Sequence, residues 1–377
     1  MRALLLVLDG LGLGATPDAD QYNSVGANTL GHLYEGRPSL RIPVLESLGL
    51  KAALCNTPED CLTGLYGRMR PCSRGNESVV GHWELAGVVT DQPLNTFLSF
   101  PTELVHPIET EAGVTFLGNQ TMSTAEALRT YAEEHLRTGR PILYTTASSA
   151  MQIAAHESVI SRPALYRIAT IARRHCERFR IGRVIARPFA GRDGTWTEGH
   201  GRADFPLAPP HTVLNSIAEM GIPVEGIGKI GDIFARSGVT RSHPVGGNAE
   251  AQAVIERLWN DPADAFLFAN LPDFDSLGGH RRDLEGYADL LEQFDRWLGE
   301  FLVCVEPDDL VIITSDHGND PALPGTDHTR EDVPLLVVHQ ERVGNLGLRH
   351  TFADVAATLG HYFRVPLMEP LQGTSFL

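Results

Sequence analysis

The stretch "LVIITSDHGNDPALPGTDHTREDVPLL", residues 310–336, places candidate metal ligands directly after an apolar run. Leu310–Thr314 has the near-continuous apolar character of a strand that is buried on both faces. Asp316 and His317 follow it at once, and Asp327 and His328 lie further along the same segment. An ordinary buried strand ends in turn residues. This stretch therefore predicts a functional site at the end of a strand.

Other apolar runs predict strands of the same kind. They are Ala3–Leu8, Ala265–Leu271 and Pro334–His339, and together with Leu310–Thr314 we expect them to be buried parallel strands. Between them, Leu284–Val303 has leucine and aromatic residues at helical spacing, which predicts an amphipathic helix. Strands alternating with helices are typical of an α/β fold with a mostly parallel sheet.

Acidic residues stand where these predicted strands end. Asp9 closes the first run, Asp273 and Asp275 follow the run 265–271, and Asp316 follows the run 310–314. A single aspartate after a strand is commonly a turn or a helix cap. Open parallel sheets, however, bind ligands beyond the carboxyl ends of their strands. With His280 and His328 added, these residues predict one site.

The predicted site has the composition of a metal centre. Carboxylates mixed with imidazoles suit Mn²⁺, Zn²⁺ or Fe²⁺ better than Ca²⁺, which prefers oxygen ligands alone. The set is larger than one catalytic metal needs, so it predicts two metals, which can clamp a phosphoryl group between them. The alternative, a set of surface polar loops, does not explain why they gather at three strand ends. The set consists of Asp9, Asp275, His280, Asp316, His317 and His328.

The middle of the chain lacks this strand-end pattern. Residues 92–208 contain apolar runs of their own and are followed by a proline-rich segment. Candidate ligands lie on both sides of them, which predicts a discontinuous core of residues 1–91 and 209–377 with an inserted domain of residues 92–208. Its arginines include Arg183, Arg187 and Arg202, of which Arg187 can offer a bidentate fork to a phosphate. The alternative for each is an ordinary surface arginine.

The segment "RGNESVVGHWELAG", residues 74–87, offers a nucleophile. We expect Ser78 at the N-terminus of a helix, where the helix dipole and nearby metals can activate its hydroxyl. The alternative is a plain N-cap serine.

A second motif, "GIGKIG" (226–231), matches G-x-G-x-x-G. A dinucleotide site also needs an acid about 20 residues further on, after a strand. Glu250 is at that distance but follows no strand-like segment, so we assign no such site.

Composition limits the partners and the compartment. Lys and Arg number 31 against 47 Asp and Glu, so the net charge is −16. This charge argues against nucleic acid and anionic membranes as partners. The five dispersed cysteines form no C-x-x-C pair, which is typical of reduced thiols. We expect no signal peptide, because Asp9 interrupts a short apolar run, and no apolar run is long enough to span a membrane. A cytoplasmic protein that binds a small molecule is predicted.

Several of these motifs together resemble the phosphopentomutase family, a prokaryotic branch of the alkaline phosphatase superfamily. The resemblance spans nearly the whole chain. It is most specific in "GHRRD" (279–283) and "GTDHTRE" (325–331). The other segments that carry it are "LVLDGLGLGATPDA" (6–19), "GHWE" (81–84), "YTTASSAMQIAAHE" (144–157), "ARPF" (186–189), "FDSLGGHRRDLEGY" (274–287) and "SDHGNDPALPGTDHTRE" (315–331).

The resemblance implies an alkaline-phosphatase-like α/β core with a smaller inserted α/β cap. It implies an isomerase that interconverts ribose (or 2-deoxyribose) 1-phosphate and 5-phosphate through a phosphoenzyme and a 1,5-bisphosphate. Two Mn²⁺ ions are implied, with a pentose or hexose 1,5- or 1,6-bisphosphate as a candidate activator. Asp9, Asp316 and His317 match the ligands of one metal, and Asp275, His280 and His328 those of the other. Ser149, Arg187 and Arg202 match the positions that meet the substrate phosphate.

The chain also departs from the family pattern. Ser78 stands where the family has a threonine nucleophile, and a serine hydroxyl can do the same chemistry. Asn76 stands where the family has a lysine. Glu77 and Ser148 each stand where the family has an aspartate. A related two-metal phosphosugar mutase or a phosphatase acting on a different sugar phosphate is the alternative function. A binding protein without catalysis is a further alternative, but binding alone does not need two metals.

Overall fold

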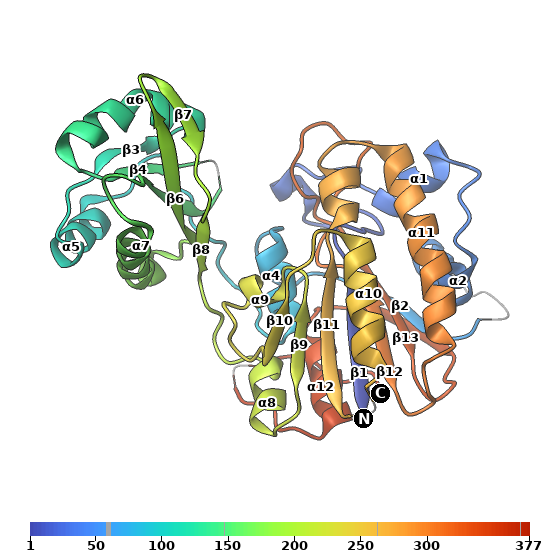
Figure 1. Cartoon of the computed structure of the whole chain (residues 1–377). Helices are drawn as coiled ribbons and strands as arrows, with labels where there is room; N and C mark the ends of the chain where they lie inside the picture. Colours follow the sequence, from blue (N-terminus) through green and yellow to red (C-terminus); the bar gives the residue numbers. More distant parts are fainter. Residues whose placement is uncertain (58–61, 147, 262, 370) are drawn as a thin grey trace. The chain divides into compact units, whose positions relative to one another are not determined.

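The computed structural model describes residues 1–57, 62–146, 148–261, 263–369 and 371–377. Cys61 and Ala147 of the segments considered above lie outside the described residues. The other four cysteines are free thiols. The chain divides into two compact units, one of residues 1–92 and 209–377 and the other of residues 93–208. Each unit has a sheet and helices of its own (Figure 1).

The first unit is built on an eight-stranded sheet with the order β10-β9-β11-β1-β12-β13-β2-β14. All neighbouring strands are parallel except β13, which is antiparallel to both β12 and β2. The strands are β1 (Arg2–Leu8), β2 (Leu65–Met69), β9 (Val224–Ile227), β10 (Arg241–His243), β11 (Ala265–Leu271), β12 (Leu310–Thr314), β13 (Val333–Val338) and β14 (Gly344–Arg349).

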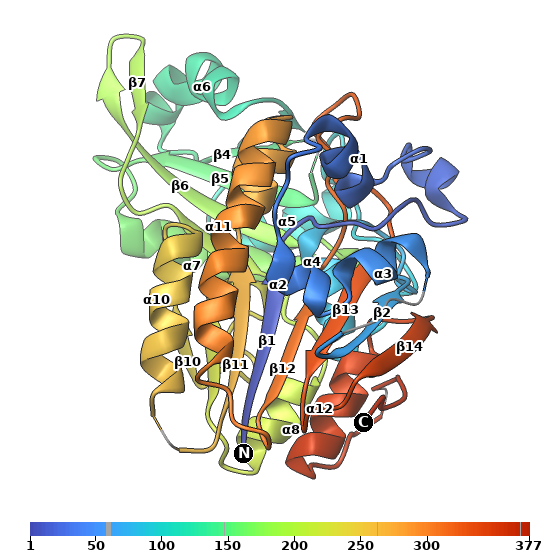
Figure 2. The ribbon, with the colours of Figure 1, turned by 90° about the vertical axis from the view of Figure 1, so that its right-hand side faces the viewer.

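Helices cover both faces of this sheet (Figure 2). The alternation of side chains along β1 sends Leu4, Leu6 and Leu8 into a core with α1, α2, α3, α10 and α11. On the other face, Phe266 of β11 contacts Phe363 of α12. The helical segments are η1 (Ala19–Tyr22), α1 (Thr29–Gly36), α2 (Pro43–Ser47), α3 (Leu50–Cys55), α4 (Ser78–Leu85), α8 (Val213–Glu219), α9 (Ile230–Ile233), α10 (Asn248–Trp259), η3 (Phe274–Gly279), α11 (Leu284–Leu302) and α12 (Asp354–Phe363).

The predicted strands are present, but one of them runs in the opposite direction. β1, β11 and β12 are parallel and buried, as expected. The run 334–339 forms the buried strand β13, and the prediction that it is parallel is wrong. A parallel return needs a crossover, usually a helix of a dozen or more residues. The chain between β12 and β13 contains no described helix, so it turns back beside β12.

The second unit has a smaller sheet, with the order β3-β4-β5-β6-β7 and with β8 paired to β6. Helices α5 and α7 pack with β5 and β6 around a separate apolar core. Its elements are α5 (Thr102–Ala112), β3 (Leu117–Thr121), α6 (Thr124–Thr138), β4 (Ile142–Thr145), β5 (Ala150–His156), α7 (Arg162–Cys176), η2 (Glu177–Phe179), β6 (Arg183–Arg192), β7 (Thr195–Glu198) and β8 (Ala203–Pro206).

None of the helices in the described part of the chain combines the length and the apolar character that crossing a bilayer requires.

Candidate metal centre

Three neighbouring strand ends bring the predicted ligands together. β1 lies between β11 and β12 and is parallel to both, so the carboxyl ends of all three strands meet at one edge of the sheet. Asp9 follows β1, Asp275 lies in the π-helical turn η3 after β11, and Asp316 lies in the turn after β12. The fold thus brings into contact residues that lie hundreds of positions apart in the sequence.

The first cluster consists of Asp9, Asp316 and His317, all of them buried. Nε2 of His317 lies 3.4 Å from Oδ1 of Asp9 and 3.2 Å from Oδ2 of Asp316. Among the described residues, neither Oδ1 of Asp9 nor Nε2 of His317 has a hydrogen-bond partner. Buried polar atoms of this kind normally have one, so this pair is suited to binding a cation.

The second cluster contains Asp275, His317 and His328. His280 lies beside it, since its Nε2 is 3.2 Å from Oδ2 of Asp275 and 3.3 Å from Nε2 of His328. The rings of His317 and His328 are stacked, with centroids 3.7 Å apart. His317 therefore lies between the two clusters, whereas the family resemblance implies that it binds the same metal as Asp9 and Asp316 only.

The main chain fixes the orientation of all three histidines. The Nδ1–H groups of His280, His317 and His328 donate to the carbonyl oxygens of Thr326, Gly318 and Asn76, respectively. With Nδ1 paired in this way, Nε2 of each ring faces the carboxylates and is the nitrogen available to a cation, the arrangement found in metal-binding histidines. Nε2 of His280 also lies 3.3 Å from Nε2 of His328, so the two nitrogens converge on one place beside Asp275.

The electrostatics of the ion-free chain are those of a site that attracts positive charge. Burial, followed by the charge of Asp316, raises the pKa of Asp9. Against the effect of its own burial, the charge of Asp316 raises the pKa of His317 to about 10. Burial and the neighbouring His317 lower the pKa of His328 to about 3. A proton on His317 thus supplies positive charge in the ion-free chain, and metal binding must displace it.

Ser78 is the first residue of α4, and its hydroxyl belongs to the site. Its Oγ donates to Oδ2 of Asp316. The N-cap position is occupied by Glu77, and the Ser78 hydroxyl contacts Asp316 and His82. The alternative role as a plain N-cap serine is therefore wrong. A Cβ on Gly81, one turn later, would lie 2.1 Å from the carbonyl oxygen of Asp316, so glycine allows α4 to approach this closely.

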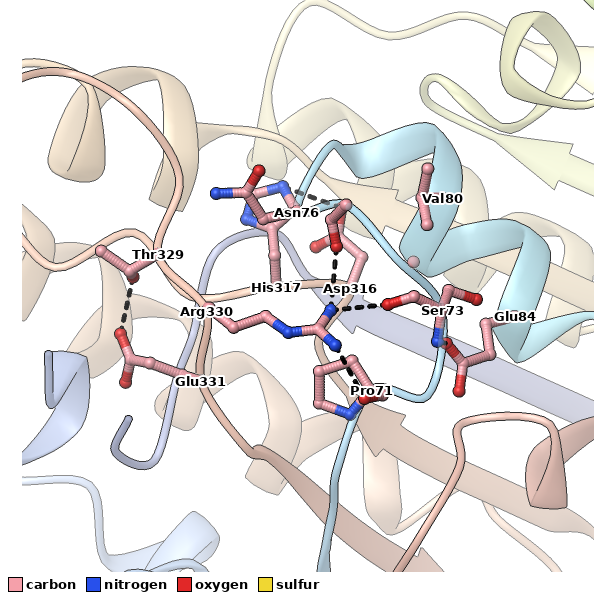
Figure 3. A pocket seen from close by; sticks show the side chains of 12 residues that line it. Pro71, Ser73, Asn76, Val80, Glu84, Asp316, His317, Thr329, Arg330 and Glu331 are labelled. Carbon is pink, nitrogen blue, oxygen red and sulfur yellow. Dashed lines mark hydrogen bonds and ion pairs between the residues drawn. The ribbon is translucent and has the colours of Figure 1, made fainter. Parts of the chain in front are cut away.

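Two residues tie the loop before Ser78 to the segment that carries His328. Asn76 donates from Nδ2 to the carbonyl of His328 (2.6 Å) and accepts from Nδ1 of the same histidine. The buried guanidinium of Arg330 donates to the carbonyls of Pro71, Ser73 and Gly75 (Figure 3). Asn76 is one of the departures from the family pattern, and here it orients a predicted metal ligand.

Sequence reasoning missed several polar residues around the clusters. Nζ of Lys229 donates to Asp9 (2.8 Å), so the lysine of "GIGKIG" contacts a predicted ligand. Asn319 donates to Asp275 (2.6 Å) and accepts from Arg282, which also donates to carbonyls of the 320–327 loop. His82 contacts Asp316 (3.2 Å). The motifs that contain Lys229, Arg282 and His82 are recognisable in the sequence. Their contacts with the predicted ligands are not, because the spacing of residues within a motif does not show which distant residues it will contact.

The predicted phosphate-binding residues all lie in the second unit. Arg187 of β6 donates to Gln152 and Glu198, and Arg202 donates through two nitrogens to Asp204. Ser149 does not lie with them along the sheet. It precedes β5, whose register pairs Ala150 with Arg183 and Ala154 with Arg187. Its hydroxyl donates to the carbonyl of Asn95 and accepts from the amide of Gly182, so it is hydrogen-bonded to the main chain of the second unit.

Comparisons with known proteins agree with this chemistry. The profile of the Metalloenzyme superfamily matches residues 1–367, so metal binding is a property of the family. The chain is 43% identical to the phosphopentomutase of Caldanaerobacter subterraneus subsp. tengcongensis, covering 100% of this chain and 97% of that one. It is 44% identical to the phosphopentomutase of Syntrophotalea carbinolica, with the same coverage.

A solved structure supports the fold. The PH0037 protein from Pyrococcus horikoshii matches with a TM-score of 0.50 and 17% identity, over 96% of this chain and 97% of that one. The predicted alkaline-phosphatase-like α/β fold class is confirmed. The profile match and the full-length relatives together establish that the chain belongs to the phosphopentomutase family of the Metalloenzyme superfamily.

Proposed function

We propose that this chain is a phosphopentomutase that interconverts ribose 1-phosphate and ribose 5-phosphate and their 2-deoxy forms. The observation that carries the proposal is the contact between the Ser78 hydroxyl and Asp316 at the edge of a cluster of carboxylates and imidazoles. Full-length similarity to proteins named phosphopentomutase supports it. A hydroxyl held against metal-binding groups suits covalent phosphoryl transfer.

The metal centre is proposed to hold two Mn²⁺ ions. Asp9, Asp316 and His317 would hold one ion, and Asp275, His280 and His328 the other. The orphaned buried atoms Oδ1 of Asp9 and Nε2 of His317 support this, as does the mixture of oxygen and nitrogen donors. When bound, two divalent ions lower the pKa of a coordinated hydroxyl and neutralise the charge on a transferred phosphoryl group.

Ser78 is the residue proposed to carry the phosphoryl group. A free hydroxyl of the pentose monophosphate attacks the phosphorus of phosphorylated Ser78. The Ser78 O–P bond breaks, the sugar O–P bond forms, and the hydroxyl proton passes to the Ser78 oxygen, which leaves a 1,5-bisphosphate. Ser78 then attacks the other phosphoryl group, and its proton returns to the sugar oxygen released. Asp316, which accepts a hydrogen bond from Ser78, orients the oxygen for both steps.

Residues of the second unit are proposed to bind the phosphate that is not being transferred. Arg187 and Arg202 offer planar guanidinium groups, which match phosphate oxygens in pairs. Glu198 and Asp204 hold these arginines in place through ion pairs. Ser149 stays a candidate on the resemblance alone, because its hydroxyl is engaged by Asn95 and Gly182. A pentose or hexose bisphosphate is the proposed activator, because it can phosphorylate Ser78.

The test is an assay of chelator-stripped protein by phosphorus NMR. Ribose 1-phosphate should remain unchanged without metal and should yield ribose 5-phosphate once Mn²⁺ and a trace of a 1,5-bisphosphate are added. Glucose 1-phosphate serves as the control substrate and should react far more slowly. A protein that stays inactive with Mn²⁺ and bisphosphate, or that converts the hexose equally well, contradicts the proposal.

A further inference from the structure

His82 is a fully buried histidine one helical turn after Ser78. Its Nδ1 lies 2.8 Å from the carbonyl oxygen of Ser78, 3.2 Å from Oδ2 of Asp316 and 3.4 Å from the Ser78 hydroxyl. One ring nitrogen therefore faces both the nucleophile and a carboxylate of the first cluster. Nothing in the proposed reaction uses it.

The opposite nitrogen of the same ring connects His82 to the other carboxylate of that cluster. Nε2 of His82 lies 3.4 Å from Nδ2 of Asn270, which also donates to Oδ2 of Asp9 at 3.0 Å. Asn270 is fully buried near the end of β11, where it pairs with Val7 of the parallel strand β1, two residues before Asp9. A short chain of contacts thus runs from Asp9 through Asn270 and His82 to Asp316 and Ser78.

The partners determine which nitrogen carries the proton. The Asn270 amide nitrogen must face Asp9, because a carboxylate accepts hydrogen bonds and the amide oxygen cannot donate. Its second hydrogen then points toward Nε2 of His82, which can pair with it only as an acceptor. The proton of the neutral ring consequently lies on Nδ1, directed between the Ser78 carbonyl and Asp316. Each donor in the chain has an acceptor, so the arrangement is internally consistent.

We propose that His82 and Asn270 form a positioning pair that sets the geometry of Ser78 and of the carboxylates of Asp9 and Asp316 for metal binding and phosphoryl transfer. The inference rests on the proposed function for Ser78. Groups that hydrogen-bond to metal ligands commonly change metal affinity or activity 10–100-fold when they are removed. His82 acts through these neighbours, and it is not proposed to touch the substrate.

Two substitutions separate the roles of the ring nitrogens. In His82→Asn, the side-chain amide can stand where Nδ1–H stood, so the hydrogen bond toward Ser78 and Asp316 is kept. In His82→Gln, the polar end reaches only the Nε2 position, so that hydrogen bond is lost. We expect His82→Gln to lose about 10–100-fold in Mn²⁺ affinity and in the rate of Ser78 phosphorylation, with KM unchanged. His82→Asn should retain most of both.

Mn²⁺ affinity is measured by titration of the full chain without sugar phosphate, and Ser78 phosphorylation by intact mass after mixing with a 1,5-bisphosphate. The matched control is His135→Gln, which removes a buried histidine of the second unit whose two ring nitrogens are both paired. It should lower the melting temperature without changing Mn²⁺ affinity. If His82→Gln does not fold, Asn270→Ala replaces it and should weaken Mn²⁺ binding in the same way.

Equal behaviour of His82→Asn and His82→Gln would overturn the inference, whether both bind Mn²⁺ normally or both fail together. Loss of stability without loss of Mn²⁺ affinity would also overturn it, because that is the result of a purely structural role. The Mn²⁺ titration does not depend on turnover. A wild-type chain that binds Mn²⁺ but isomerises no sugar phosphate therefore refutes the proposed function while the comparison of the two variants still tests His82.

Discussion

Ser78 directs its hydroxyl proton to Asp316, a carboxylate that also lies 3.2 Å from Nε2 of His317. Despite full burial, the neighbouring His317 and His82 hold the pKa of Asp316 well below its ordinary value, so it remains an anionic acceptor. The Ser78 oxygen is consequently oriented toward the clusters before any substrate binds. Orientation of this kind lowers the barrier to a reaction between bound groups.

The first prediction concerns the Ser78→Ala variant. It removes the oxygen that is proposed to accept the phosphoryl group but leaves the six predicted ligands in place. We expect Mn²⁺ binding to be retained and isomerisation to be lost. Intact mass after activation with a bisphosphate should show one added phosphate on the wild-type chain and none on the variant. A variant with normal turnover would assign the nucleophile to another residue.

His135 gives a prediction of pH dependence away from the metal centre. Burial lowers its pKa below the ordinary value of 6.5, opposed by the hydrogen bond to Arg140 and assisted by His156. Between the folded and unfolded pKa values the unfolded chain binds more protons, so the free energy of unfolding rises with pH there. Stability should therefore fall as the pH drops below about 6.5 toward the folded pKa.

Urea unfolding at a series of pH values measures this effect. The wild-type chain should lose stability on acidification, and His135→Gln should lose less over the same range because its side chain does not titrate. Identical pH profiles for the two proteins would show that His135 is not the group responsible.

At the scale of elements, the site depends on how a loop is held against a strand end. Arg330 lies two residues after His328, and its guanidinium binds three carbonyls of the loop that leads into α4. It also pairs with Asp18 and lies over the ring of Tyr22. The loop carrying Ser78 and the segment carrying His328 are thereby joined through one buried side chain.

Replacing Arg330 by Gln should therefore weaken both the fold and the centre. The glutamine amide cannot reach all the carbonyls, which leaves buried acceptors and Asp18 without their partner. We expect a loss of about 3 kcal/mol in the free energy of unfolding. Arg74→Gln is the matched control, an exposed arginine of the same loop, and should change stability little. Equal unfolding free energies for the two variants would contradict this role of Arg330.

Parts of this arrangement can be predicted from sequence, for reasons that particular residues make clear. Asp9, Asp275 and Asp316 follow apolar runs, and the geometry of parallel strands brings such residues to one edge. The direction of β13 could not be predicted from its composition, because a buried antiparallel strand is as apolar as a parallel one. The position of His317 between both clusters and the contacts of Lys229, His82 and Asn270 depend on three-dimensional packing that spacing does not encode.

At the scale of the whole molecule, a chain of net charge −16 is proposed to bind a dianionic phosphate. Divalent metals can neutralise the transferred group, and arginines of the second unit can neutralise the other one. In the structure Arg187 is already paired with Glu198, and the Arg187 side chain is 15% exposed. If Arg187 binds the phosphate as proposed, its guanidinium is oriented before the phosphate arrives.

Arg187→Ala tests that contribution. The variant should bind ribose 1-phosphate more weakly and raise KM, with a cost of about 2–5 kcal/mol if the arginine pairs with a buried phosphate. Mn²⁺ affinity should not change. Arg192→Ala, an exposed arginine on the same strand, is the control and should have wild-type kinetics. Unchanged kinetics in Arg187→Ala would show that Arg187 does not bind the substrate phosphate.

The central claim is that a phosphoryl group on Ser78 returns to the sugar and does not pass to water. Water competes for the phosphoserine at high concentration, so a mutase must exclude it while the bisphosphate turns round. The most direct measurement is the ratio of ribose 5-phosphate to inorganic phosphate formed from ribose 1-phosphate with Mn²⁺ and a trace of 1,5-bisphosphate. We predict that ribose 5-phosphate accounts for nearly all of the substrate consumed. Inorganic phosphate released in step with the loss of ribose 1-phosphate would contradict the claim and identify the protein as a phosphatase.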